Sequence, residues 1–133
     1  MAPNSRKQQK ARILVAEDEP DIRELIAITL SFNGFDVASA ADGQEALTMA
    51  DSGSFDLIIL DVRMPRMTGF EACRALRQQE TTRNIPIIFL SAKGQESEVQ
   101  DGLEAGADEY IVKPFAPNYL AERVRATIAG CNT

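Results

Sequence analysis

Carboxylate, hydroxyl and ammonium side chains follow short apolar runs at several places in this 133-residue sequence. They are Glu17-Asp18-Glu19, Asp61, Ser91 and Lys113. Carboxylates that are crowded together repel one another, so a cation is needed to neutralise them. One or two carboxylates, with water and a phosphate, are the usual ligands of Mg²⁺. A carboxylate beside such a metal can attack phosphorus and form an aspartyl phosphate, and Lys113 would help to neutralise a phosphoryl group on Asp61.

Each of these residues also has a purely structural interpretation. An acidic residue after a strand often caps the next helix, and we favour that interpretation for Glu19. For Asp18 taken alone, capping a helix and binding a metal would be about equally expected. Ser91 alone would be a turn hydroxyl, and Lys113 alone a surface charge. The functional interpretation therefore depends on the elements that would bring these residues together.

Continuous apolar runs predict strands that are buried on both faces, as the strands of a parallel sheet are. The runs are Ile13–Ala16, Leu57–Leu60 and Ile87–Leu90, with weaker strand candidates at Phe35–Ser39 and Glu109–Val112. The residues named above stand directly after these strands.

Helical patterns fill the intervals between the strands. The helices are expected to begin near Pro20, Asp42, Phe70, Gln95 and Pro117, and to end near Asn33-Gly34, Ala50, Thr82, Gly106 and Ile128. In the first helix Ile22, Leu25, Ile26 and Thr29 share one face. Asp42 followed by Glu45 predicts a side-chain cap at the start of the second.

This alternation predicts an α/β fold in which right-handed crossovers build a doubly wound, five-stranded parallel sheet. We expect the strand order 2-1-3-4-5, that is, a flavodoxin-like (βα)5 three-layer sandwich. Ligands bind to such sheets at the carboxyl ends of the strands, where the acidic residues, Ser91 and Lys113 would meet. Residues 12–129 would form the domain, with a polar, basic tail at 1–11 and a short tail at 130–133.

Composition excludes several classes of function. The sequence has no histidine, so it cannot contain a Ser-His-Asp or Cys-His nucleophile system, a histidine-ligated zinc site or a phosphohistidine of its own. Its formal net charge of −6 disfavours binding to nucleic acid or to an anionic membrane through net charge. We expect a cytoplasmic protein, because there is no signal peptide or membrane span and because Cys73 and Cys131 have no metal or redox spacing.

The motifs around these residues resemble those of bacterial response-regulator receiver domains. They are Ile13–Glu19, Asp56–Pro65 with Thr68-Gly69, Leu90–Lys93 and Gly106–Phe115. The similarity extends from about Arg12 to Ile128, and the pattern is nearest to receivers of winged-helix transcriptional regulators.

The resemblance implies a phosphoacceptor signalling domain, not an enzyme that acts on other substrates. Asp61 would accept a phosphoryl group from the phosphohistidine of a histidine kinase or a histidine phosphotransfer protein. Mg²⁺ would be held by Asp61, Asp18 and the backbone carbonyl of Arg63, with Glu17 acting through water. The side chains of Arg63 and Lys93 would flank the path of the water that hydrolyses the aspartyl phosphate.

The remaining implied roles concern the switch. Lys113, in a cis peptide bond with Pro114, would pair with Asp61 and then with the phosphoryl group. Ser91 would bond a phosphoryl oxygen, and Tyr110 would be the aromatic residue whose ring changes exposure.

Phosphorylation would then change the face formed by the fourth helix, the fifth strand and the fifth helix, through which such receivers form homodimers. Asp108, Glu109, Arg123 and Arg125 fit the charged residues of that face. Val99 and Tyr119 stand where this class usually has a basic and an acidic partner, so an apolar contact would replace one charge pair. The alternative is that Val99 packs inside and Tyr119 lies on the surface. The resemblance implies no direct contact of this chain with nucleic acid or a membrane.

Three other functions fit the sequence less well. A haloacid-dehalogenase-like phosphatase needs a second aspartate two residues after the nucleophile, where this sequence has Arg63. A flavodoxin-like cofactor carrier needs a phosphate-binding loop after the first strand, where Glu17-Asp18-Glu19 would repel phosphate. A receiver-like interaction module that is never phosphorylated is disfavoured because every site position is filled.

Overall fold

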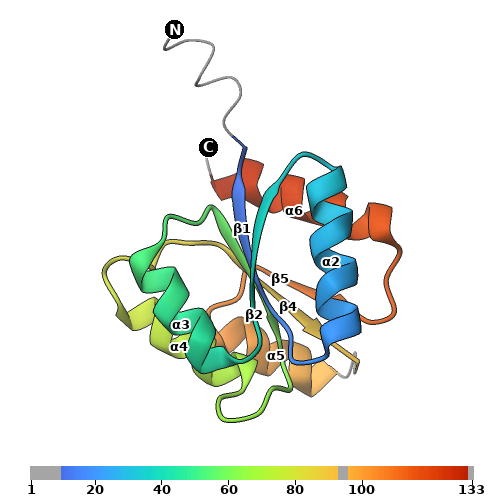
Figure 1. Cartoon of the computed structure of the whole chain (residues 1–133). Helices are drawn as coiled ribbons and strands as arrows, with labels where there is room; N and C mark the ends of the chain where they lie inside the picture. The colour runs from blue at the N-terminus through green and yellow to red at the C-terminus, as the bar shows by residue number, and fades with distance from the viewer. Residues whose placement is uncertain (1–9, 93–95, 132–133) are drawn as a thin grey trace, which may run out of the picture.

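The computed structural model of the protein describes residues 10–92 and 96–131. Within these residues, five strands form one parallel sheet in the order β2-β1-β3-β4-β5, which confirms the expected order (Figure 1). The strands are β1 Arg12–Ala16, β2 Asp36–Ala40, β3 Leu57–Asp61, β4 Ile87–Ser91 and β5 Glu109–Val112.

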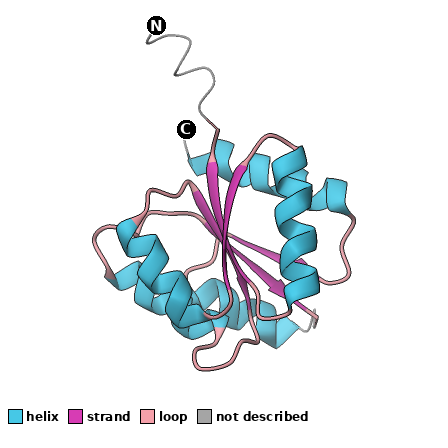
Figure 2. Cartoon of the chain, in the orientation of Figure 1, coloured by secondary structure: helices cyan, strands magenta, loops and turns pink. Residues whose placement is uncertain are grey.

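Helices cover both faces of this sheet, so the expected three-layer sandwich is confirmed (Figure 2). The helices are α2 Pro20–Phe32, α3 Gly43–Ser52, α4 Gly69–Gln78, α5 Glu96–Ala105 and α6 Pro117–Cys131. Side chains of α2 and α6 pack on one face, and those of α3, α4 and α5 pack on the other. In the described part of the chain, no helix combines the length and the apolar composition that crossing a membrane requires.

The interior positions of the central strands are all apolar because both of their faces are covered. Leu14, Ile58 and Phe89 belong to the core beneath α3, α4 and α5. Their neighbours Ile13, Ile59 and Leu90 belong to the core beneath α2 and α6. Successive side chains of a strand point to opposite faces, so each central strand contributes to both cores. The edge strands β2 and β5 are partly exposed, which is why their sequence signal is weaker.

Local hydrogen bonds and one left-handed glycine set the ends of three helices. The side chain of Asp42 accepts a hydrogen bond from the backbone N–H of Glu45 at 2.9 Å, which confirms the expected cap of α3. A capping box between Thr68 and Glu71 begins α4. After α2, Gly34 has a φ of 93°, a left-handed conformation that glycine adopts without strain.

Three sequence-based expectations about these helices were wrong in detail. Leu25 is 50% exposed, and the buried residues of α2 are Ile26 and Leu30, so the buried face is rotated away from Leu25. The side chain of Glu19 makes no capping hydrogen bond, although Glu19 occupies the position before α2. Helix α4 ends at Gln78, before Thr82, whose hydroxyl donates to the carbonyl of Leu76 at 2.6 Å in the following turn. Helix α6 ends at Cys131.

Candidate functional site

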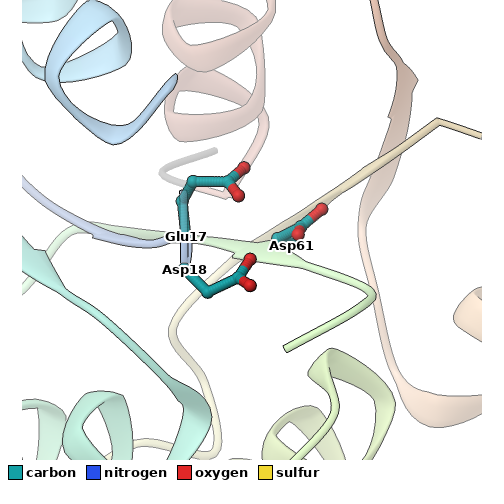
Figure 3. Close-up of side chains that lie close together, drawn as sticks. All are labelled: Glu17, Asp18 and Asp61. Atoms are coloured by element: carbon teal, nitrogen blue, oxygen red, sulfur yellow. The ribbon is translucent and has the colours of Figure 1, made fainter. Parts of the chain in front are cut away.

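Three carboxylates meet at the carboxyl ends of β1 and β3. Asp61 is the last residue of β3, and Glu17 and Asp18 directly follow β1. Figure 3 shows the three side chains converging, and one oxygen from each lies within 4.8 Å of the others. Glu17 and Asp61 are buried, whereas Asp18 is the most exposed of the three. This group matches the acidic cluster expected from the sequence.

Lys113 joins this cluster from the end of β5. Its ammonium lies 3.1 Å from Oε1 of Glu17 and 3.1 Å from Oδ1 of Asp61. The Lys113–Pro114 peptide bond is cis, as expected. One ammonium therefore neutralises part of the charge of three carboxylates, and the excess negative charge favours a divalent cation.

Burial changes the proton affinities of this group. Burial, followed by the negative charge of Asp61, raises the pKa of Glu17 to about 7. Burial also raises the pKa of Asp61, and the nearby charge of Lys113 opposes that increase. Burial alone would lower the pKa of Lys113, but the charges of Asp61 and Glu17 raise it. Bringing these groups to the edge of the sheet thus favours the protonated form of Glu17 more than solvent exposure would.

Backbone contacts hold the two carboxylate-bearing segments in place. The backbone N–H of Glu19 donates to Oε2 of Glu17 at 3.2 Å, and the guanidinium of Arg23 donates to the carbonyl of Glu17 at 2.8 Å. After Asp61, the backbone N–H of Val62 donates to the carbonyl of Leu90 at 2.9 Å. Neither Arg23 nor the backbone role of Glu19 was predicted from the sequence.

The loop between β3 and α4 is fastened to the start of α3. Arg66 has a φ of 68° and places its guanidinium 2.6 Å from the carboxylate of Asp42. That ion pair lowers the pKa of Asp42.

Arg63, in the same loop, lines a cavity of about 230 Å³ together with Asp18, Asp61, Ser91 and Lys113. The structure thus brings the sequence-predicted site residues Asp18, Asp61, Ser91, Lys113 and Arg63 to one cavity, whereas Lys93 lies outside the described residues.

The predicted switch residues share a contact that sequence analysis missed. The hydroxyls of Ser91 and Tyr110 both donate hydrogen bonds to Oε1 of Glu98 in α5. Burial, and then the hydrogen bond to Glu98, raise the pKa of Tyr110 to about 12. Nothing in the sequence distinguishes Glu98 from Glu96 or Glu104 on the same helix.

The residues predicted for the face formed by α5, β5 and α6 do not all make contacts within that face. Glu109 and Arg123 pair at 2.8 Å and join β5 to α6. Asp108 accepts hydrogen bonds from Arg77 at 3.1 Å and from the backbone of Ile87 at 2.9 Å. Arg125 donates to the side chain of Asn33 at the end of α2, at 2.8 Å. Val99 is partly exposed and Tyr119 is 47% exposed.

Comparisons with known proteins agree on one family. The family model described as the response regulator receiver domain matches residues 13–125. A probable transcriptional regulator ycf27 of Porphyridium aerugineum is 44% identical over 120 residues, which cover 90% of this chain and 49% of that protein. The response regulator MprA of Mycobacterium avium is 48% identical over 117 residues, which cover 88% of this chain and 50% of that protein. The chain therefore spans about half the length of these curated relatives.

Solved structures give the same match. The chemotaxis protein CheY4 of Vibrio cholerae has a TM-score of 0.86 at 39% identity, with 90% of this chain and 99% of that chain covered. The receiver domain of the sensor histidine kinase PA1611 of Pseudomonas aeruginosa has a TM-score of 0.85 at 33% identity, with 91% and 99% covered. The latter structure was described with a magnesium ion coordinated in its active-site cleft.

Proposed function

This chain belongs to the response regulator receiver domains and is thus a receiver of two-component phosphorelay signalling, and we propose that Asp61 is the residue that accepts the phosphoryl group. The position of Asp61 is the observation that carries this proposal. It is buried at the end of β3, 3.1 Å from Lys113 and within 4.8 Å of the acidic side chains that follow β1. We assign this function to residues 12–129.

In the proposed transfer, a carboxylate oxygen of Asp61 attacks the phosphorus of a phosphohistidine on a partner. A phosphorus–oxygen bond forms while the phosphorus–nitrogen bond breaks, and its electron pair returns to the partner's imidazole. We propose that the histidine belongs to a histidine kinase or a histidine phosphotransfer protein, because residues 1–133 contain none. Lys113 orients Asp61 and then neutralises an oxygen of the transferred group, and the hydroxyl of Ser91 donates to another.

The donor set at this site fits Mg²⁺. Asp18, Asp61 and the backbone carbonyl of Arg63 would hold the ion, and Glu17 would contact it through water. Support comes from the clustered carboxylate oxygens, which are hard ligands carrying more negative charge than Lys113 can balance. When bound, Mg²⁺ supplies positive charge to the phosphoryl oxygens.

The chain is a signalling domain and not an enzyme in the usual sense. We propose that it also hydrolyses its own aspartyl phosphate, with the exposed side chain of Arg63 beside the path of the water. We place the reaction in the cytoplasm, where histidine kinases hold their phosphohistidine. No direct contact with nucleic acid is assigned to these residues, whose sequence has a formal net charge of −6.

We propose further that phosphorylation changes the face formed by α5, β5 and α6, and that this face binds a second copy or a partner. The exposed apolar side chains of Tyr119 on α6, Val112 on β5 and Leu103 on α5 support this proposal. Val99, Asp108, Glu109 and Arg123 lie on the same three elements or directly beside them. Arg125 is directed to α2 and supports this face less.

Labelling with a phosphorylated histidine kinase tests the assignment of Asp61. Wild type should gain close to one phosphoryl group per chain, and Asp61→Asn should gain none because an amide is not a competent nucleophile. Asp56→Asn, which changes an exposed aspartate before β3, is the matched control and should be labelled like wild type. Stoichiometric labelling of Asp61→Asn would refute the assignment. A wild type that is never labelled would favour the non-phosphorylatable interaction module.

The same assay tests the metal. Chelation with EDTA should abolish labelling, and Asp18→Ala should require far more Mg²⁺, because it removes a direct carboxylate ligand. Asp21→Ala, which changes an exposed aspartate of α2, is the control. An unchanged Mg²⁺ requirement in Asp18→Ala would contradict the role of Asp18.

A further inference from the structure

The carboxylate of Glu98 connects three elements around the site. Ser91 ends β4, Tyr110 lies in β5, and the hydroxyl of each donates to the same oxygen, Oε1 of Glu98, near the start of α5. Glu98 is therefore in direct contact with both predicted switch residues.

Close packing of α5 explains why Glu98 can reach them. A Cβ atom on Gly102 would lie 3.0 Å from the ring of Phe89 and 3.3 Å from the ring of Tyr110. Glu98 precedes Gly102 by four residues and so lies on the same face of the helix, one turn earlier. The rings of Phe89 and Tyr110 pack edge to face with centroids 6.4 Å apart. This arrangement directs Glu98 towards β4 and β5.

The hydroxyl proton of Ser91 cannot serve two acceptors at full strength. A serine hydroxyl has a single proton to donate, and a carboxylate is a strong, charge-assisted acceptor. A phosphoryl group on Asp61 would bring new anionic oxygens to the cavity that Ser91 lines. The phosphoryl group and Glu98 would then compete for the same proton.

We propose that Glu98 is a positioning residue that holds Ser91 and Tyr110 in the unphosphorylated arrangement and loses Ser91 when Asp61 is phosphorylated. This inference rests on the proposed function of Asp61. Loss of Ser91 removes one of the donors that anchor the beginning of α5, so the event at Asp61 reaches the helix that carries Val99. Glu98 thereby also lowers the affinity of the resting site for a phosphoryl group.

The contact with Tyr110 is tested first, at neutral pH and without any phosphodonor. The experiment uses Tyr119→Phe as background, which leaves Tyr110 as the only tyrosine of the chain. With ¹³C-labelled tyrosine, Glu98→Gln should move the ring resonance of Tyr110, because a neutral amide replaces the anionic acceptor. Glu104→Gln is the matched control: it makes the same change of charge on an exposed residue of α5 that contacts Gln100.

The effect on the site is tested with beryllofluoride and Mg²⁺ as the phosphoryl mimic. Glu98→Gln should bind the mimic roughly three- to tenfold more tightly than Glu104→Gln does, which is the scale of the net contribution of one hydrogen bond. Glu98→Ala, which removes the acceptor altogether, should give at least the same gain. A purely structural role would weaken binding instead, because an unfolded or loosened site binds the mimic less well.

Each outcome decides the inference. Equal or weaker binding by both Glu98 variants, with a wild type that binds, overturns the inference and leaves the proposed function standing. An unmoved Tyr110 resonance in Glu98→Gln also overturns it, whatever the affinity. A wild type that does not bind beryllofluoride contradicts the proposed function, and the inference then falls with it.

Discussion

Burial in the fold favours the protonated form of Glu17, whereas a bound cation would favour its charged form. Glu17 is fully buried, pairs with Lys113 at 3.1 Å, and has Asp61 as a charged neighbour. Its pKa of about 7 in the folded chain lies above the ordinary value of 4.5. The folded protein therefore holds a proton that the unfolded chain has already lost in the interval between these values. A metal-free receiver should lose stability as the pH rises through about 7.

We predict that Glu17→Gln removes much of this pH dependence. In EDTA, the free energy of unfolding of wild type should fall between pH 5 and pH 8. The variant should reduce that fall by about 1–3 kcal/mol, since one pKa unit corresponds to about 1.4 kcal/mol. Urea denaturation at each pH measures the effect, with Glu24→Gln on the exposed side of α2 as control. Identical slopes for wild type and Glu17→Gln would contradict the prediction.

Residue types at strand ends could be predicted, but side-chain partners across the fold could not. Asp61, Ser91 and Lys113 directly follow apolar runs, so the sheet alone brings them together. Glu98 and Arg23 reach the site from within helices, where acidic and basic residues are common and most face solvent. Which of them turns inward depends on how closely each helix packs, a property of the three-dimensional fold.

At the scale of elements, the start of α4 packs directly on the end of β3. A Cβ atom on Gly69, the first residue of α4, would lie 2.3 Å from the backbone oxygen of Asp61 and 3.0 Å from Cα of Val62. The backbone N–H of Gly69 also donates to the carbonyl of Val62 at 2.9 Å. The position of Asp61 therefore depends on the absence of a side chain at residue 69.

We predict that Gly69→Ala pushes α4 away from Asp61. Overpacking of this kind should cost about 1–3 kcal/mol of unfolding free energy, and it should slow labelling by a phosphorylated kinase. Gly130→Ala on α6 is the matched control, because a Cβ atom there would meet nothing within 4 Å. That control should be neutral or slightly stabilising, as Ala is a better helix former. Urea denaturation and the labelling rate measure both effects, and a Gly69→Ala protein that matches Gly130→Ala would exclude close packing at this junction.

A helix or strand could be predicted well from the sequence where all the apolar residues on it are buried. Strands β1, β3 and β4 are buried on both faces and read as continuous apolar runs. The buried face of α2 was misjudged at Leu25 because the apolar residues of this helix extend beyond the face that packs on the sheet. Leu25, Ile28 and Phe32 are all exposed, so apolar spacing alone does not identify the contact face.

At the scale of the whole molecule, the strand order followed from general rules of chain connection. Right-handed crossovers and the usual order of a five-stranded sheet place β1 and β3 side by side, which puts Asp18 next to Asp61. No comparable rule predicts which charged residues on the surface pair with each other. Glu109 and Arg123, predicted as members of a dimer network, are paired with each other within the chain. This pair is partly exposed, and surface pairs contribute only about 0–1 kcal/mol each, so it can exchange partners at low cost.

We predict that beryllofluoride with Mg²⁺ promotes dimers through the face of α5, β5 and α6. Tyr119, Leu103 and Val112 are 47%, 48% and 43% exposed, and their burial would contribute about 25 cal/mol per Å² removed from water. Sedimentation velocity should show a larger species with the mimic than without it, and Tyr119→Glu should abolish that change by placing a charge in the contact. Phe32→Glu makes an equivalent change on α2, where Phe32 is 91% exposed, and should leave the dimer intact. If the protein is a monomer in both states and Tyr119→Glu leaves partner binding unchanged, this face is excluded from the response. The exposed apolar side chains would then have no role in transmitting the change at Asp61.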